Sequence, residues 1–454
     1  MTTTTSPPIV SIQAPKDVSI EQIEAELRQI WESYNQEDGQ AATRAATFSL
    51  IVFEPDPVQQ LLTALGFYSG PVDGISGPRT AAAVEEAQKA YDLEVTGKIT
   101  PEFKEKLEAE FTKAKAEGKL SSEAAYAPDA RAAGLADAIA AISPCRIITL
   151  CVTSGEDEGV EAQVSAYCPI QKQKQSNLVC CEYITLRGTA PALERVGGII
   201  SALTIGDLPK FLWWKATPEP DYGLFKRLAK DCDRVIVDSS NFNAPETDLL
   251  QIGQLLESSV SMADLNWGRL AAWQELTAEA FDPPERRSAI LEVDRVTIDY
   301  EKGNISQAIM YLGWLASRLQ WSPVSFDRQE QDGGGYDIAK VKFTTADERG
   351  EIEAELAGVP VADAGDILGD LTSLRLSSTN LDADCCTVLC SETTGCMRME
   401  AGGGAQSCRI QQVTPLFDQR TDRLLGEELQ RWSSDALYEE SMGLAAQILD
   451  LAKN

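Results

Sequence analysis

Residues 206–241 read GDLPKFLWWKATPEPDYGLFKRLAKDCDRVIVDSSN, and this stretch predicts the architecture of the chain around it. An apolar run ends at Trp214, an amphipathic segment at helical spacing follows the turn residues, and a second apolar run covers residues 234–238. Two strands joined by a helix of this length pair in parallel with a right-handed crossover. We therefore expect Trp214 and Asp238 at the carboxyl edge of one sheet, where open α/β sheets bind ligands.

The tryptophan pair in this stretch has two interpretations. Adjacent aromatic residues in a strand point to opposite faces, and both Trp213 and Trp214 can pack under flanking helices. Alternatively, one of them lies near the end of the strand as an anchor for a protein partner. Both residues are therefore candidates for partner binding.

Composition limits the classes of function. The 454 residues are 43% hydrophobic, which supports a sizeable core and two or three domains. The formal net charge of −30 repels phosphate backbones and anionic lipid, so we expect neither a nucleic-acid partner nor a membrane role. A basic or mixed protein surface is the expected partner.

The chain contains no histidine, and this excludes the commonest catalytic arrangements. Ser-His and Cys-His nucleophiles and histidine-containing metal sites are ruled out, whereas carboxylate, lysine or thiolate chemistry remains open. The sequence also lacks the common glycine-rich nucleotide fingerprints. We therefore expect no catalytic residue, no metal and no cofactor. The one enzymatic alternative is chemistry at the sheet edge near Asp238.

The beginning of the chain and its cysteines indicate the compartment. Residues 1–8 form no secretory signal, and the longest apolar region, residues 196–214, is interrupted by Asp207, Pro209 and Lys210 before it could span a bilayer. We expect a cytoplasmic protein. In that reducing compartment the 11 cysteines favour reduced thiols or a redox switch over a static disulfide framework.

Elements beyond the opening stretch complete an α/β core. Ser19 and Gln22 match a capping box before a helix over residues 20–34, and strands are expected at residues 47–53, 146–152, 160–168 and 178–187. A helix over residues 191–205 and apolar helical stripes over 265–276 and 309–319 should cover the sheet.

An insertion separates the first two core strands. Residues 55–107 include VQQLL, LGFY, GPVDG, GPRT and TGKIT, and this pattern resembles the peptidoglycan-binding-like fold, a small module of three helices. The sequence departs from that family at Ala87, where an aromatic residue is usual, and at Thr96-Gly97, which replaces a second Asp-Gly. Because fold does not determine function, we favour protein contact over glycan binding for this module.

The family resemblance of the chain rests on several segments outside the insertion. The chain resembles the OpcA family in five segments: Leu208-Pro209 before FLWW, RVIVDS at residues 234–239, Cys180-Cys181-Glu182, SPCR at 143–146 and DLNWGRL at 264–270. This resemblance implies an assembly protein or allosteric effector of glucose-6-phosphate dehydrogenase. Cyanobacterial members of the family carry such an insertion.

The last third of the chain changes to an alternating pattern. Apolar alternation separated by turn residues predicts a meandering antiparallel sheet from Gly333, and two helices close the chain within residues 422–451. The expected fold is an α/β core sheet with an inserted three-helix peptidoglycan-binding-like module and a C-terminal β-rich α+β domain. The expected divisions are residues 1–54 (first helix and strand), 55–112 (insertion), 113–130 (linker or solvated helix), 131–325 (core) and 326–454 (C-terminal domain).

Five cysteines crowd this last region: Cys385, Cys386, Cys390, Cys396 and Cys408. Residues 386–400 predict a hairpin with a five-residue loop, in which Leu389 lies opposite Met397 and Cys390 opposite Cys396. A disulfide between Cys390 and Cys396 would suit this geometry, and a thioredoxin could reverse it. A zinc or iron-sulfur site and inert thiols remain as alternatives.

Together these expectations describe a non-enzymatic, redox-tuned regulator that binds glucose-6-phosphate dehydrogenase and promotes its active oligomer, thereby raising NADPH supply from the oxidative pentose phosphate pathway. The alternatives are an α/β enzyme acting near Asp238 and a binding module that uses the peptidoglycan-like insertion.

Overall fold

A computed structural model describes most of the chain. The described residues are 9–37, 46–55, 58–68, 78–116, 144–152, 157–169, 181–242, 244–284, 286–330, 336–345, 350–360, 367, 369–380, 387–392, 396–401, 410–415 and 420–452. They form two compact units, the first comprising residues 1–237 with 425–430 and the second 238–424 with 431–454. The boundary between these compact units lies at residue 237 rather than at 325, and residues 295–301, which precede position 325, form a strand of the second sheet.

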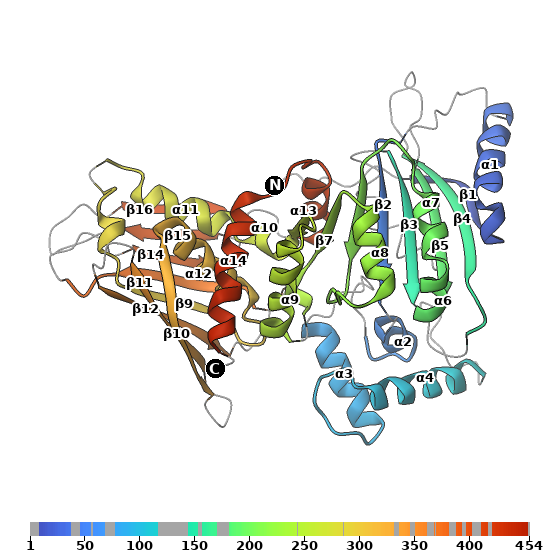
Figure 1. The fold of residues 1–454 in the computed structure, drawn as a ribbon. Helices are drawn as coiled ribbons and strands as arrows, with labels where there is room; N and C mark the ends of the chain where they lie inside the picture. Colours follow the sequence, from blue (N-terminus) through green and yellow to red (C-terminus); the bar gives the residue numbers. More distant parts are fainter. Residues whose placement is uncertain are drawn as a thin grey trace. The chain divides into compact units, whose positions relative to one another are not determined.

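The first unit is built on a mostly parallel sheet with the strand order β1-β4-β5-β3-β2-β6-β7 (Figure 1). Its strands are β1 (Ile9–Val18), β2 (Phe48–Glu54), β3 (Cys145–Val152), β4 (Glu161–Pro169), β5 (Cys181–Gly188), β6 (Lys210–Trp214) and β7 (Arg234–Val237). Parallel pairings run from β5 to β7, and β4 pairs antiparallel with both β5 and β1. The predicted strand, helix, strand unit is confirmed as β6, α8 and β7.

The helices of the first unit differ in detail from the expectation. They are α1 (Ile23–Glu37), α6 (Ala190–Arg195), α7 (Gly197–Leu203) and α8 (Gly223–Asp231). A 3-10 turn, Ile20–Gln22, precedes α1, and the side chain of Ser19 makes no capping hydrogen bond, so the predicted capping box is wrong. The expected helix over 191–205 is divided into α6 and α7 at Val196. Strand β1 was not predicted.

The insertion contains helices α2 (Val58–Ala64), α3 (Pro78–Ala90) and α4 (Pro101–Ala116), which share one apolar core. Ala87 is fully buried in that core, where a larger side chain would find no room without rearrangement. The buried amide of Gln88 replaces the missing Asp-Gly turn by accepting from the N–H groups of Thr96 and Gly97 and donating to Lys98 O. Helix α4 extends into the expected linker, whose remainder lies outside the described residues.

The second unit contains a sheet in the order β10-β11-β12-β9-β13-β14-β15-β16. Its strands are β9 (Arg295–Glu301), β10 (Trp321–Glu330), β11 (Asp337–Thr345), β12 (Glu351–Val359), β13 (Leu371–Ser377), β14 (Thr387–Glu392), β15 (Cys396–Ala401) and β16 (Ile410–Pro415). Neighbouring strands pair antiparallel, as the alternating sequence indicated, except that β12 and β9 are parallel.

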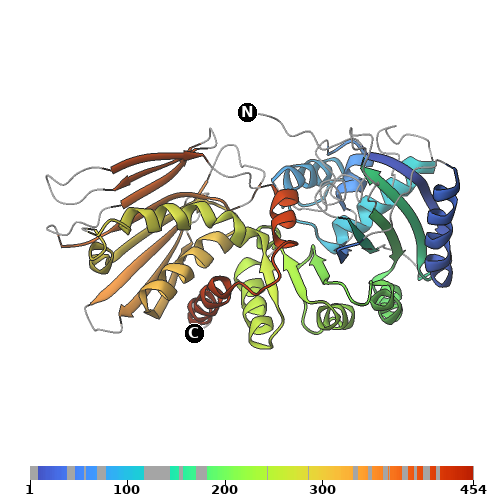
Figure 2. The ribbon, with the colours of Figure 1, turned by 90° about the horizontal axis from the view of Figure 1, so that it is seen from above.

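Three helices contact this second sheet: α11 (Ala271–Phe281), α12 (Ser306–Leu319) and α14 (Ala436–Leu451). The other helices after β7 are α9 (Pro245–Glu257), α10 (Leu265–Arg269) and α13 (Thr421–Glu428), and a short strand β8 (Met262–Asp264) precedes α10. Helix α11 contacts β14 and β15, whereas α12 contacts β9 and β10, so the two helices lie along the same sheet (Figure 2). The apolar stripes at residues 265–276 and 309–319 therefore supply core, as predicted, but α11 and α12 contact the second sheet rather than the α/β sheet that the sequence led us to expect.

Candidate functional site

Asp238, the carboxylate expected at the sheet edge, follows β7 directly and is buried. Arg269 binds it in a bidentate manner, with Nη1–Oδ1 and Nη2–Oδ2 distances of 2.7 and 2.8 Å. The hydroxyl of Ser240 donates to Oδ1 at 2.6 Å, and the Ser240 N–H donates to the same oxygen. Both carboxylate oxygens are thus held by groups of the protein itself.

A wider hydrogen-bond network surrounds this ion pair. The Oδ1 atom of Asp264 accepts from the N–H groups of Ser239 and Asn266, at 3.0 and 2.9 Å. Gln307 donates to Asn266 Oδ1 and to Asp370 Oδ1, the latter at 2.6 Å. We call this set the Asp238 cluster: Asp238, Ser239, Ser240, Asp264, Asn266, Arg269, Asn304, Gln307 and Asp370. It connects the segment after β7 with α10, α12 and the start of β13.

The charges of the Asp238 cluster are unequal, with three carboxyl groups around one guanidinium. Burial opposes ionisation of Asp238, but the charge and hydrogen bonds of Arg269 outweigh it and lower the pKa of that carboxyl. Burial and the Asp238 charge raise the pKa of Asp264 to about 6, and burial raises that of Asp370 to about 6. The ionised Asp238 is therefore a buried structural anchor, because a general base must reach the proton of a substrate.

Both candidate anchor tryptophans are buried, with 2% of each side chain exposed. Strand β6 lies between β2 and β7 inside the sheet, and as adjacent residues of a strand Trp213 and Trp214 point to opposite faces of it. Trp214 stacks on Phe53 with a centroid distance of 3.7 Å, and the Lys215 ammonium lies 4.3 Å from the Trp213 ring. This burial agrees with the packing interpretation of the pair, and a partner-binding role for either residue stays a prediction.

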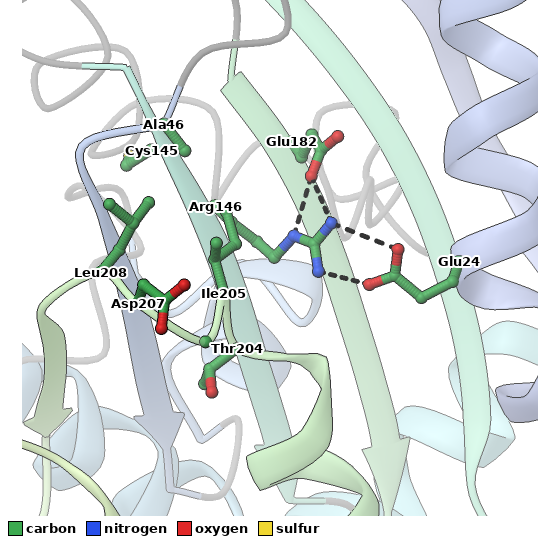
Figure 3. Close-up of a pocket in the computed structure, with 10 residues that line it drawn as sticks. Glu24, Ala46, Cys145, Arg146, Glu182, Thr204, Ile205, Asp207 and Leu208 are labelled. Carbon is green, nitrogen blue, oxygen red and sulfur yellow. Dashed lines mark hydrogen bonds and ion pairs between the residues drawn. The ribbon is translucent and has the colours of Figure 1, made fainter.

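A pocket of about 590 Å³ opens at the amino ends of the strands of the first sheet, whereas Asp238 follows the carboxyl end of β7. Figure 3 shows Arg146 at its centre, reaching from β3 between Glu182 of β5 and Glu24 of α1. The Arg146 Nη2 atom lies 2.7 Å from Glu182, and Nη1 donates to the carbonyl of Leu203 at the end of α7. Thr204 to Leu208 line the side formed by the segment between α7 and β6.

We call Arg146, Glu182, Glu24 and Trp31 the Arg146 cluster. Trp31 joins it because its indole N–H donates to Glu182 Oε1 at 2.7 Å. Burial by itself would lower the pKa of Arg146, but Glu182 and Glu24 together raise it, so the guanidinium stays charged. The sequence prediction missed this cluster, although a signal existed: Arg146 and Glu182 are charged residues at the start of two apolar strands.

The structure corrects the register of the predicted cysteine hairpin. Cys390 of β14 lies opposite Arg398, and Cys396 of β15 lies opposite Glu392. Leu389 lies opposite Met399 rather than Met397, which is a shift of two residues from the prediction. Cys385, Cys386 and Cys408 lie outside the described residues. The shorter turn of the observed hairpin is the reason that Cys390 and Cys396 are not directly opposed.

Family models match most of the chain. Residues 136–254 match a model described as "Glucose-6-phosphate dehydrogenase subunit N-terminal domain", and residues 260–442 match the corresponding C-terminal domain. Residues 56–107 match a "Putative peptidoglycan binding domain". These three matches coincide with the core, the second unit and the insertion.

Similar full-length proteins carry one name, "Putative OxPP cycle protein OpcA". The Synechocystis sp. protein is 61% identical over 100% of this chain and 96% of its own length. The Nostoc punctiforme protein is 60% identical over 98% of this chain and 96% of its own, and that of Synechococcus elongatus is 49% identical over 98% of each.

Solved structures give a much weaker likeness. A 3-ketoreductase from Actinomadura kijaniata in complex with NADP aligns with a TM-score of 0.39 and 11% identity, over 58% of this chain and 80% of that chain. A likeness of this size does not imply a shared activity. Within the described part of the chain, no helix has the length and apolar character needed to cross a membrane.

Proposed function

Because this chain belongs to the OpcA family of glucose-6-phosphate dehydrogenase subunits, we propose that it is a non-enzymatic regulator which binds that dehydrogenase and promotes its active oligomer. The observation that carries the proposal is the match of family models to both units, together with 61% identity over the full chain to a relative named for the OxPP cycle. Its place of action is the cytoplasm, where the dehydrogenase supplies NADPH.

The physical mechanism is linkage between binding and oligomer state. A protein that binds one oligomeric or conformational state more tightly than the others must increase the population of that state. The regulator needs no active site for this effect, only a surface that distinguishes the two states of its partner. The net charge of −30 favours a partner surface that is basic or mixed in charge.

The first sheet supports a binding role over catalysis. The chain places its parallel strands first on one side of β2 (β3 and β5) and then on the other side (β6 and β7), so the strand order reverses between β2 and β6. Open α/β sheets bind ligands beside the carboxyl ends of the strands at such a reversal. Here the buried pair of Glu54 and Lys215 occupies that position, with an Nζ–Oε1 distance of 2.9 Å, and Phe53 stacks on Trp214 beside it. Side chains of the protein thus fill the place where a nucleotide enzyme holds its cofactor.

The proposal is tested by titrating the full chain into the purified cognate dehydrogenase while its activity and sedimentation are followed. We expect a complex that sediments faster than either protein, a higher activity, and weaker association at high ionic strength because charged surfaces are screened. The absence of a complex at low salt, or a complex without change in oligomer and activity, would contradict the proposal.

Redox tuning through Cys390 and Cys396 is a finer part of the proposal. In the observed register the two residues are diagonal neighbours, and the Cα atoms of such neighbours are about 7–8 Å apart. A disulfide across a Cα separation above about 7 Å requires backbone movement. A two-residue shift of β15 would align the cysteines and keep every side chain on its face. The disulfide form is thus a hairpin of different register, and thioredoxin would restore the observed one.

This redox step is measured by mass spectrometry of alkylated peptides after mild oxidation and after thioredoxin treatment. We expect a peptide linked through Cys390 and Cys396, and an effect on the dehydrogenase that disappears in the Cys390→Ser variant but not in the control Cys232→Ser. If both hairpin thiols can still be alkylated after oxidation, redox tuning at this hairpin is excluded. The regulatory role itself is tested separately, by the titration with the dehydrogenase.

For the insertion we propose a protein-contact role. Its helices share their own apolar core, so the module is a separate small surface appended after β2. Sedimentation of the full chain with purified cell-wall sacculi should leave the protein in the supernatant. Binding to the sacculi that the Gln88→Ala variant loses would instead assign glycan recognition to this module.

A further inference from the structure

A second pair of cysteines lies at the amino ends of β3 and β5. These strands pair in parallel with Arg146 opposite Glu182, so Cys145 and Cys181, each one residue earlier, begin the two strands side by side. The Cys145 N–H donates to Cys181 Sγ at 3.4 Å. Neighbouring strands are about 4.8 Å apart, which lies within the Cα separation of about 4.4–6.8 Å found in disulfides.

The surroundings of the pair restrict what can reach it. Cys145 lines the pocket of about 590 Å³ beside Arg146, whereas the two residues are otherwise buried, with exposed fractions of 1% and 0%. A pocket of this size admits a small molecule such as hydrogen peroxide. It does not admit the active site of a protein disulfide reductase, which must contact the sulfur directly.

We propose that Cys145 and Cys181 are a peroxide-sensitive dithiol that forms a disulfide between β3 and β5. Peroxide oxidises the pocket-lining thiol of Cys145 to a sulfenic acid and releases one water. The Cys181 sulfur then attacks the sulfenic sulfur, the S–O bond breaks, and a second water leaves with the remaining thiol proton. Two thiols and one peroxide thus give one disulfide and two waters, and the two electrons reduce the peroxide.

The electrostatics of the site predict a slow reaction that accelerates with pH. The hydrogen bond with Cys181, followed by burial, raises the pKa of the Cys145 thiol, and the thiolate is the reactive form. The charged groups that line the pocket are Arg146 of β3, Glu182 of β5, Glu24 of α1 and Asp207 before β6. Three carboxylates facing one guanidinium give no excess positive charge to favour a thiolate.

This site is independent of the proposed hairpin disulfide and of the dehydrogenase partner. The hairpin cysteines need a register change, whereas Cys145 and Cys181 already begin adjacent strands at matching positions. We therefore expect the two pairs to respond to different agents, the hairpin to thioredoxin and the strand pair to peroxide and small thiol reductants.

The experiment treats the reduced full chain with hydrogen peroxide, alkylates the remaining thiols and maps disulfides in tryptic peptides. The expected product joins peptide 132–146, which contains Cys145, to peptide 175–187, which contains Cys180 and Cys181. Fragmentation of the linked peptide in the mass spectrometer must assign the disulfide to Cys181. The yield of the linked peptide after a fixed reaction time must rise from pH 7 to pH 9. Separately alkylated peptides, or a bond through Cys180, would overturn the proposal.

Matched variants supply a second readout. The Cys180→Ser and Cys151→Ser controls should retain the linked peptide and the rise in thermal midpoint that a new covalent link between strands produces, and Cys181→Ala should lose both. If Cys181→Ala shows the same peroxide-dependent rise in midpoint as the parent, the link lies elsewhere and the proposal fails. The mapping of the parent protein remains decisive even if Cys181→Ala does not fold.

Discussion

The Arg146 cluster and the Asp238 cluster bury the same kind of charge in two different ways. Each guanidinium is 3% exposed and paired with carboxylates. The Arg146 cluster borders a pocket, and its Glu24 side chain is 46% exposed, so solvent shares in balancing the charge. The Asp238 cluster has one guanidinium for three carboxyl groups, of which Asp238 and Asp264 are buried, and burial raises the pKa of Asp264 and of Asp370 to about 6.

The difference teaches that the cost of breaking a buried ion pair depends on what else can compensate the remaining charge. Water and a second carboxylate are available to the Arg146 cluster, whereas the Asp238 cluster must rely on its own hydrogen bonds. The variants below rank these effects within one chain.

Arg269→Met should give the largest effect. It leaves the Asp238 carboxylate buried without its cation, which typically costs about 3–5 kcal/mol of unfolding free energy. Urea unfolding at neutral pH measures the loss. The matched control Arg195→Met removes an exposed partner of Asp157, which solvent screens, and should cost much less than Arg269→Met. Equal losses in the two variants would contradict the assigned role of burial.

Glu182→Gln should give an intermediate loss, about 1.5–3 kcal/mol, the range for hydrogen bonds to charged groups. Glu24 and the Leu203 carbonyl still hold Arg146, and the amide oxygen of glutamine can still accept from Trp31. Urea unfolding and the fluorescence of Trp31 in α1 check this result. A loss as large as that of Arg269→Met would show that the open pocket provides no compensation.

Asp264→Asn should change the pH dependence of stability. Because burial raises the folded-state pKa of Asp264 to about 6, the contribution of its protonated form is complete below the unfolded pKa and is lost as pH rises through about 6. The stability advantage of the parent over the variant should therefore fall between about pH 4 and 6, by at most about 1.4 kcal/mol per pH unit.

Urea titrations across that range measure the difference, with the exposed Asp282→Asn as control. A difference that stays constant from pH 4 to 6 would show that Asp264 does not carry the proton in the folded state.

Glu24→Gln should give the smallest effect, about 1 kcal/mol or less, since its side chain is half exposed and solvent screens its attraction to Arg146. The comparison with Glu182→Gln uses the same guanidinium and the same chemical change. If Glu24→Gln proves the more damaging variant, the exposed helix α1 rather than the buried strand β5 secures Arg146.

Much of the fold could be predicted because it follows from local patterns. The alternation of strand β6, helix α8 and strand β7 is visible in residues 206–241, and the glycine-containing turns of the insertion identify its module. The candidate site was predicted less well. Asp238 was found by its place after a buried strand, but its partner Arg269 lies 31 residues away and has no local signature.

The sequence by itself determined the order of the main elements, the class of the insertion and the family, because hydrophobic period and turn residues act over a few positions. Only the tertiary structure decided that both Trp213 and Trp214 are buried, that Cys390 faces Arg398, and that Cys145 starts a strand beside Cys181. Burial, register and pairing depend on segments that are distant in the chain, and their energies appear only when the sheets assemble.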